Sequence, residues 1–233
     1  MKTVCTFLLL VVSTMVFSQE TNQMDANGKR HGIWKKTFDN SPVLRYEGTF
    51  FHGKEIGLFK FYKNLNNKAV LTATKEFDQK NSKAYVKFFA STGKLISEGT
   101  MDGKKYIGTW KYYQKDSDAL LTLEHYDAFG NLYGERLVYY PNGEIAEKQF
   151  YKAGKLDGVS VVFSDKKVLL SEVVYANDEL HGYSKYFSPK GELVAEGFYK
   201  NGKKEGVWKY YENGRPTEEK NFSNMPKYIK KTP

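Results

Sequence analysis

The stretch that decides the fold is residues 195–211, which read AEGFYKNGKKEGVWKYY. It holds two runs in which aromatic or apolar residues alternate with polar ones, and an Asn-Gly-Lys sequence separates them. Alternation with a period of two is typical of half-buried β-strands, and Asn and Gly tolerate the positive φ angles of tight hairpins. The stretch therefore predicts two antiparallel strands joined by a glycine turn.

This unit recurs along most of the chain. A glycine, or an alanine in one unit, begins an aromatic-rich run every 24 to 27 residues, at Gly32, Gly57, Ala84, Gly108, Gly134, Gly158, Gly182 and Gly206. Such a period is typical of solenoids and elongated repeat sheets, and no segment shows a sustained apolar period of 3.6 residues. We therefore predict an all-β fold, an elongated and twisted single sheet of about eight tandem β-hairpins over residues 28–223.

Most of the repeat glycines are expected to be structural, because they close turns that need positive φ. This group comprises Gly32, Gly57, Gly108, Gly158, Gly182 and Gly206. Two units depart from the pattern. The turn before Ala84 lacks glycine, and the run after Gly134 is interpreted as carrying one extra residue.

Residues 46–57, YEGTFFHGKEIG, and residues 195–208 resemble the MORN repeat, in which an aromatic residue and glycine precede a Gly-Lys turn and a further glycine. They are more closely similar to the bacterial MORN-variant family, some members of which are described as antitoxins or immunity proteins. The resemblance spans residues 28–222. It implies a fold of β-hairpin repeats and leaves the function open.

Residues 1–18 have the features of a secretory signal peptide. The basic Lys2 precedes an apolar run, and a small residue, Ser18, ends it. The run is short for a membrane span and no second apolar stretch follows, so we expect no transmembrane segment in the mature chain. We expect cleavage after Ser18, export to the periplasm or the medium, a short linker over residues 19–27 and a flexible basic tail over residues 224–233.

Composition excludes several classes of function. The single cysteine, Cys5, lies inside the apolar run, so the mature chain has no thiol for a disulfide, a thiolate metal site or a cysteine nucleophile. The formal net charge is +9, and the basic residues are mostly lysines. Sequence-specific nucleic-acid binding relies more on arginine forks, so we do not expect it.

One face of the predicted sheet is expected to supply the core. Residues two positions after the repeat glycines share a face, and the largest of them are Trp34, Phe59, Trp110 and Trp208. Rings of this size bury much area and usually form the core, although an exposed surface that stacks ligands is the alternative. We predict that these four residues are structural.

The opposite face combines lysines with aromatic residues. Period-two alternation places there Lys60, Tyr62, Lys87, Phe89, Lys111, Tyr113, Lys185, Phe187, Lys209 and Tyr211, and Tyr140 and Phe163 continue the aromatic positions where valine replaces lysine. We call these twelve residues the Lys-aromatic strip. The strip is interpreted either as cross-strand packing with solvated lysines, or as a recognition surface for an anionic or sugar-rich partner.

A carboxylate also recurs in each unit, at Glu47, Glu76, Glu98, Glu124, Glu147, Glu172, Glu196 and Glu219. Isolated carboxylates about 10 Å apart do not converge on a cation, so a ladder of Glu–Lys pairs between neighbouring strands is the better interpretation. His31 and His181 share one repeat position and His52 lies in a turn, a placement that follows the repeat. We therefore expect no metal site.

The sequence contains no nucleophile elbow, phosphate loop or metalloprotease motif. We expect neither catalysis nor a cofactor. The leading hypothesis is an exported, non-catalytic binding scaffold whose partner is another protein or an anionic or sugar-rich envelope polymer. The alternatives are an immunity-type protein that neutralises a toxin and, after that, an accessory enzyme.

Overall fold

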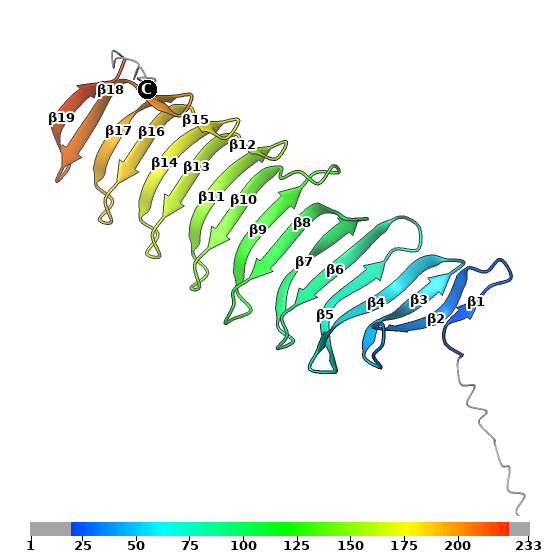
Figure 1. The fold of residues 1–233 in the computed structure, drawn as a ribbon. Coiled ribbons are helices and arrows are strands. Elements are labelled where there is room, and N and C mark those ends of the chain that lie inside the picture. The colour runs from blue at the N-terminus through cyan, green and yellow to red at the C-terminus, as the bar shows by residue number, and fades with distance from the viewer. Residues whose placement is uncertain (1–19, 224–233) are drawn as a thin grey trace, which may run out of the picture.

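A computed structural model describes residues 20–223, and these form strands and turns only (Figure 1). The predicted signal peptide and the predicted basic tail lie outside the described residues. The strands are β1 (Gln23–Met24), β2 (Arg30–Thr37), β3 (Leu44–Phe51), β4 (Lys54–Leu65), β5 (Lys68–Phe77), β6 (Lys83–Phe89), β7 (Leu95–Asp102), β8 (Lys105–Tyr113), β9 (Leu120–Tyr126), β10 (Gly134–Tyr139), β11 (Ile145–Lys152), β12 (Lys155–Leu156), β13 (Gly158–Phe163), β14 (Leu169–Ala176), β15 (Glu179–Leu180), β16 (Gly182–Phe187), β17 (Leu193–Lys200), β18 (Lys203–Glu212) and β19 (Arg215–Asn221).

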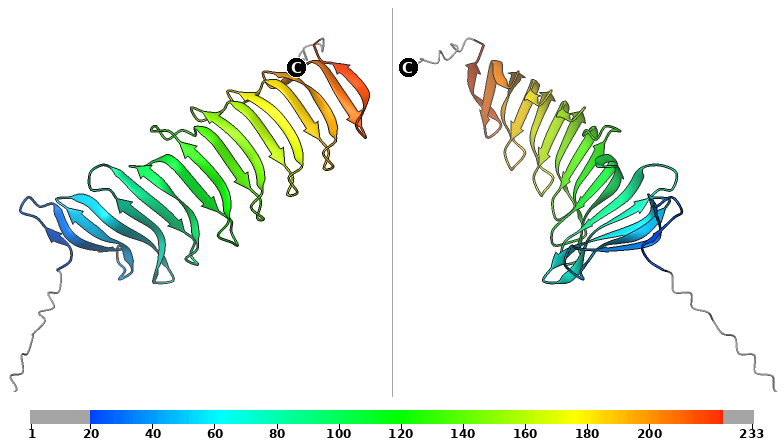
Figure 2. Two further views of the ribbon diagram at one scale, coloured as in Figure 1. Left: turned by 180° about the vertical axis from the view of Figure 1, so that it is seen from behind. Right: turned by 45° about the vertical axis from the view of Figure 1, so that its right-hand side comes forward.

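The long strands pair antiparallel in chain order, from β2 to β19. The two-residue strands β1, β12 and β15 pair with β2, β11 and β14. The result is one open, twisted sheet that extends along the molecule without a crossover (Figure 2). Three strands, β1, β12 and β15, have only two residues, and the other sixteen form eight successive hairpins. The predicted all-β, elongated single-sheet array is therefore confirmed. No helix in residues 20–223 is long and apolar enough to cross a membrane.

The turns follow from residues that accept positive φ. Asn213 and Gly214 have φ of 51° and 72°, and Asn201 and Gly202 have 50° and 74°. Two successive positive φ angles match the twist of the flanking strands, which is why hairpins favour Asn-Gly at these positions. The local sequence of each unit thus specifies its own hairpin.

One sheet without a covering layer must build its core from its own side chains. We call the face that carries Phe59, Trp110 and Trp208 the inner face, and these three rings have no exposed surface. Tyr106 stacks on Trp110 with ring centroids 3.9 Å apart. Four residues of straight strand span about 13 Å, so the strand must fold back over the ring. Phe59, Trp110 and Trp208 are thus buried, whereas Trp34 at the end of the array is only partly buried.

The fold-back occurs at the repeat glycines. Gly108 has φ +65°, and the register between β7 and β8 shifts at this point. Gly57 and Gly206 have φ of +62° and +67° and accompany the same shift in their own repeats. These glycines therefore bend the strands and fold the preceding turn onto the inner face.

Gly206 allows a test of this conformational role. A Cβ at Gly206 would have no atom within 4 Å, so only its φ of +67° opposes a side chain. We expect Gly206→Ala to lower the free energy of unfolding by about 1–2 kcal/mol, and Gly206→Asn to cost less because asparagine tolerates this region. Urea unfolding of the two variants measures the difference. An equal loss of unfolding free energy in the two variants would show that the positive φ of Gly206 is not the cause.

The inner face becomes polar in the middle of the array. Glu124 pairs with Trp110 across β8 and β9, so it lies on the inner face and not on the expected Glu–Lys ladder. Arg136 donates to Glu124 at 3.0 Å and to Gln149 at 3.0 Å. Glu147 also lies on this face, 3.8 Å from Arg136. The predicted ladder is therefore wrong for Glu124 and Glu147, because the register between β9 and β11 places them beside arginine.

Candidate functional site

The outer face, opposite the buried rings, carries a ladder of lysine and glutamate. Glu47 lies between Lys35 and Lys60 on the two neighbouring strands, and its Oε1 is 3.7 Å from Lys60 Nζ. Glu98 in the same way faces Lys87, with 3.5 Å between Oε2 and Nζ, and Lys111. Exposed pairs of this kind contribute at most about 1 kcal/mol each. The ladder therefore neutralises much of the lysine charge and adds little stability.

Tyrosines of the Lys-aromatic strip are part of this ladder. The hydroxyl groups of Tyr62, Tyr113 and Tyr211 donate to Glu47, Glu98 and Glu196 at 2.7, 2.5 and 2.7 Å, respectively. These tyrosines are half-buried. Their hydroxyl groups are thus engaged within the protein, and a partner would meet ring edges and lysine side chains.

The electrostatics of the ladder keep these hydroxyl groups neutral. Burial, together with the hydrogen bond to Glu47, raises the pKa of Tyr62 to about 12. The hydrogen bond to Glu196, followed by burial, raises the pKa of Tyr211 to about 12. The same bond is the main cause that lowers the pKa of Glu196. At neutral pH the tyrosines are donors and the glutamate is ionised.

One member of the strip does not lie in the strand column. The backbone N–H of Tyr140 donates to Glu144 O, as that of Ser164 donates to Val168 O in the next repeat, so Tyr140 begins a turn. The strand residue that matches Phe163 is Tyr139. The expected extra residue after Gly134 is therefore wrong, because the additional residues lie before it, in the loops that flank β9.

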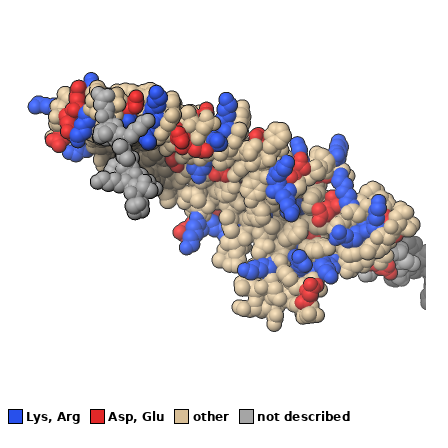
Figure 3. All heavy atoms as spheres, turned by 45° about the horizontal axis from the view of Figure 1, so that its top comes forward, with Lys and Arg blue, Asp and Glu red and all other residues tan. Residues whose placement is uncertain are grey.

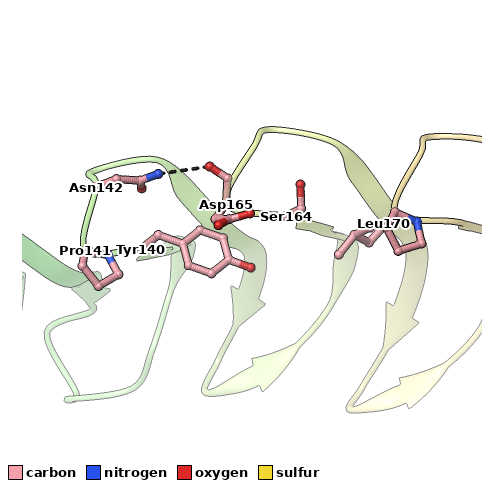
Figure 4. Close-up of a pocket in the computed structure, with 7 residues that line it drawn as sticks. Tyr140, Pro141, Asn142, Ser164, Asp165 and Leu170 are labelled. Carbon is pink, nitrogen blue, oxygen red and sulfur yellow. Dashed lines mark hydrogen bonds between the residues drawn. The ribbon is translucent and has the colours of Figure 1, made fainter.

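Tyr140 instead lines an open hollow of about 470 Å³ between neighbouring hairpin turns (Figure 4). Its hydroxyl group donates to Phe163 O at 2.9 Å, and Asn142 Nδ2 donates to Asp165 O at 3.0 Å. Pro141, Leu170 and Pro189 supply apolar wall. Asp165 is the only carboxylate among the lining residues, so the hollow holds no pair of groups for acid–base chemistry. Its apolar lining could accommodate a small apolar group of a ligand.

The structure reveals a further column on the outer face. Residues directly after the repeat glycines share this face with the lysines, and several are large, apolar and about half exposed. With their second-strand neighbours they form the outer apolar column, which comprises Leu58, Tyr85, Phe150, Val159, Tyr183, Phe198 and Val207. Tyr183 and Phe198 are 50% and 41% exposed and lie directly opposite each other on β16 and β17.

Sequence reasoning missed this column although the signal was present. Period-two alternation places the residue one position after each glycine on the same face as the residues three and five positions after it. The column is continuous in the second half of the array, where Val159 pairs with Val174 and Tyr183 with Phe198.

Basic and acidic side chains are mixed along the molecule in the view of Figure 3, without one large area of a single sign.

Two of the histidines lie together, although the sequence indicated only that their placement follows the repeat. His31 and His52 have ring centroids 4.8 Å apart, and His52 Nδ1 lies 2.6 Å from Asp25 Oδ2. The bond to His52, and then backbone N–H groups, lower the pKa of Asp25 to about 2. This cluster lies at the β1 end of the sheet. The sequence did not indicate it, because Asp25, His31 and His52 come from three different segments of the chain.

Comparison with protein families gives one match. Residues 132–153 and 180–201 match the MORN repeat variant. The first segment covers β10 and β11, and the second covers β16 and β17. No curated protein matches the chain. The chain therefore carries MORN-variant repeats, as the resemblance of the hairpins implied.

Proposed function

We propose that this MORN-variant repeat protein is an exported, non-catalytic scaffold that binds another protein through its outer face. MORN repeats generally mediate binding or scaffolding, which supports the class of function. The features of residues 1–18 support export. The single observation that carries the choice of surface is the outer apolar column, because contiguous exposed apolar area marks interaction sites.

The composition of the face favours a protein partner over a polymer that binds by charge alone. Lys60, Lys87 and Lys209 each lie within 4 Å of a glutamate, so the lysines are partly neutralised. The exposed rings of Tyr183 and Phe198 remain, and aromatic side chains dominate the energetics of protein interfaces. The repeat also presents similar groups about every 10 Å, which suits an extended partner segment.

Capture from an envelope extract tests the proposal. We expect Tyr183→Ser combined with Phe198→Ser to reduce the amount of captured partner about tenfold or more, because the pair supplies exposed ring area in the continuous second half of the column. Phe129→Ser is the matched control, since Phe129 is 76% exposed but lies in the turn between β9 and β10. Both proteins are expected to melt close to the wild type.

The outcomes separate the partner classes. Full capture by the double variant would remove the outer apolar column from consideration. Capture that survives protease treatment of the extract and falls in Lys111→Ala would indicate an anionic envelope polymer. If the captured protein is a toxin whose activity the chain inhibits, the immunity-type function holds on the same surface.

A further inference from the structure

The N-terminal end of the array brings three metal-binding side chains together from three chain segments. Asp25 lies in the turn between β1 and β2, His31 lies on β2, and His52 lies in the turn between β3 and β4. One ligand atom of each lies within 4.8 Å of the other two. We propose that these residues bind a zinc-type divalent metal ion that fastens the N-terminal cap of the sheet.

The carboxylate is held in place by its own turn. Asp25 Oδ1 accepts the backbone N–H groups of Asn27 and Lys29 at 2.8 and 2.9 Å. Its other oxygen, Oδ2, points to His52 Nδ1 at 2.6 Å. The carboxylate is thus fixed with Oδ2 beside an imidazole nitrogen, and the proton that these two atoms share would leave when both bind an ion.

The two imidazoles complete the set. His31 Nδ1 is buried and has no hydrogen-bond partner within residues 20–223. An unpaired buried nitrogen is costly, and a metal ion would satisfy it if that nitrogen is the ligand atom. His52 has 52% of its side chain exposed, which leaves a path for an ion to enter. Gly53 N–H donates to Arg30 O at 2.8 Å and holds the His52 turn against β2.

The donor atoms select the class of metal. Two imidazole nitrogens and one carboxylate suit Zn²⁺ and similar transition metals, whereas Ca²⁺ and Mg²⁺ need more oxygen ligands. Ligands around tetrahedral Zn²⁺ are about 3.3 Å apart, given bond lengths of about 2.0–2.1 Å. The Asp25–His52 pair, at 2.6 Å, would therefore open by under about 1 Å. The longest separation in the set, within 4.8 Å, would close by up to about 1.5 Å, and a water molecule would take the fourth position.

Other repeats supply natural controls. His181 and Asn201 occupy the positions of His31 and His52, and the φ of Asn201, 50°, matches the 48° of His52. His181 Nδ1 lies 3.3 Å from Asn201 Oδ1, so an amide stands where the first repeat has an imidazole. Asp127 begins a turn like that of Asp25, with N–H groups of Phe129 and Asn131 on Oδ1. Only the first repeat combines these features, within residues 20–223.

Zinc titration of the full chain, expressed without a histidine tag, tests the proposal. We expect one Zn²⁺ per chain, at least tenfold weaker binding in His52→Asn, His31→Gln and Asp25→Asn, and wild-type binding in His181→Gln and Asp127→Asn. His52→Asn keeps the turn, because Asn201 shows that asparagine adopts the same φ. Zn²⁺ is also expected to raise the melting temperature of the wild type and not of His52→Asn.

Cobalt gives an independent readout of the ligands. Co²⁺ bound to the wild type is expected to show visible absorption of a low-symmetry site with nitrogen ligands, and this signal should be lost in His31→Gln. Absence of saturable Zn²⁺ binding by the wild type would overturn the proposal. Equal loss of binding in His181→Gln or Asp127→Asn would overturn it too, because it would show that the effect does not come from the three named residues.

Discussion

Replacing Trp110 with alanine is expected to lower the free energy of unfolding by about 3–5 kcal/mol. The ring has no exposed surface, and Tyr106 stacks on it with centroids 3.9 Å apart. Its Nε1 also donates to Thr100 O at 2.9 Å, so truncation leaves a cavity and an unpaired carbonyl. Urea unfolding followed by circular dichroism measures the loss.

A control at the same repeat position separates burial from residue type. Trp34 is only partly buried, and its Nε1 donates to Gln23 O on the short strand β1. We expect Trp34→Ala to cost clearly less than Trp110→Ala. Because repeats contact only their neighbours, hydrogen exchange should report the loss in Trp110→Ala mainly in β7, β8 and β9. Unchanged melting of Trp110→Ala would show that the inner face is not the core.

The array itself could be predicted because each hairpin is encoded locally. Turn residues such as Asn213 and Gly214 specify a tight turn without help from distant contacts, and the spacing of 24 to 27 residues repeats that information. Period-two alternation then sorted the side chains correctly wherever the register is regular, as for Phe59, Trp110 and Trp208. Local rules were sufficient for the fold and for the buried rings.

Register errors arose where the local count is ambiguous. The assumption of one extra residue after Gly134 gave Tyr140 as a strand residue, whereas the bond from its N–H to Glu144 O makes it the first residue of a turn. The inward position of Glu124 depends on the register between β8 and β9, which its own sequence does not reveal. The cluster of Asp25, His31 and His52 was missed for a similar reason, since it joins two turns and a strand.

The glycines that support the buried rings were also missed. Gly48, Gly99 and Gly197 lie directly beneath Phe59, Trp110 and Trp208 on the neighbouring strand. The signal was the constant spacing of eleven residues between each glycine and its ring. Glycine in a strand interior often marks a close approach of another group, and here that group is an aromatic ring.

Gly99→Ala is therefore expected to destabilise the protein by about 2–3 kcal/mol, although alanine usually suits a strand better than glycine. A Cβ at Gly99 would lie 2.5 Å from Trp110 Cδ2, and the ring cannot retreat because Tyr106 stacks on it. The effect is steric, since the φ of Gly99 is not in the left-handed region. Thermal and urea unfolding of Gly99→Ala measure it.

A double-mutant cycle on the equivalent pair isolates this contact. Gly197→Ala is expected to cost as much as Gly99→Ala in the wild-type background, where Trp208 covers the glycine. In Trp208→Ser, which imitates the repeats with Ser160 and Ser184 on the inner face, the added methyl group should cost little, because the ring is gone. The same cost for Gly197→Ala in both backgrounds would show that the ring does not require the glycine.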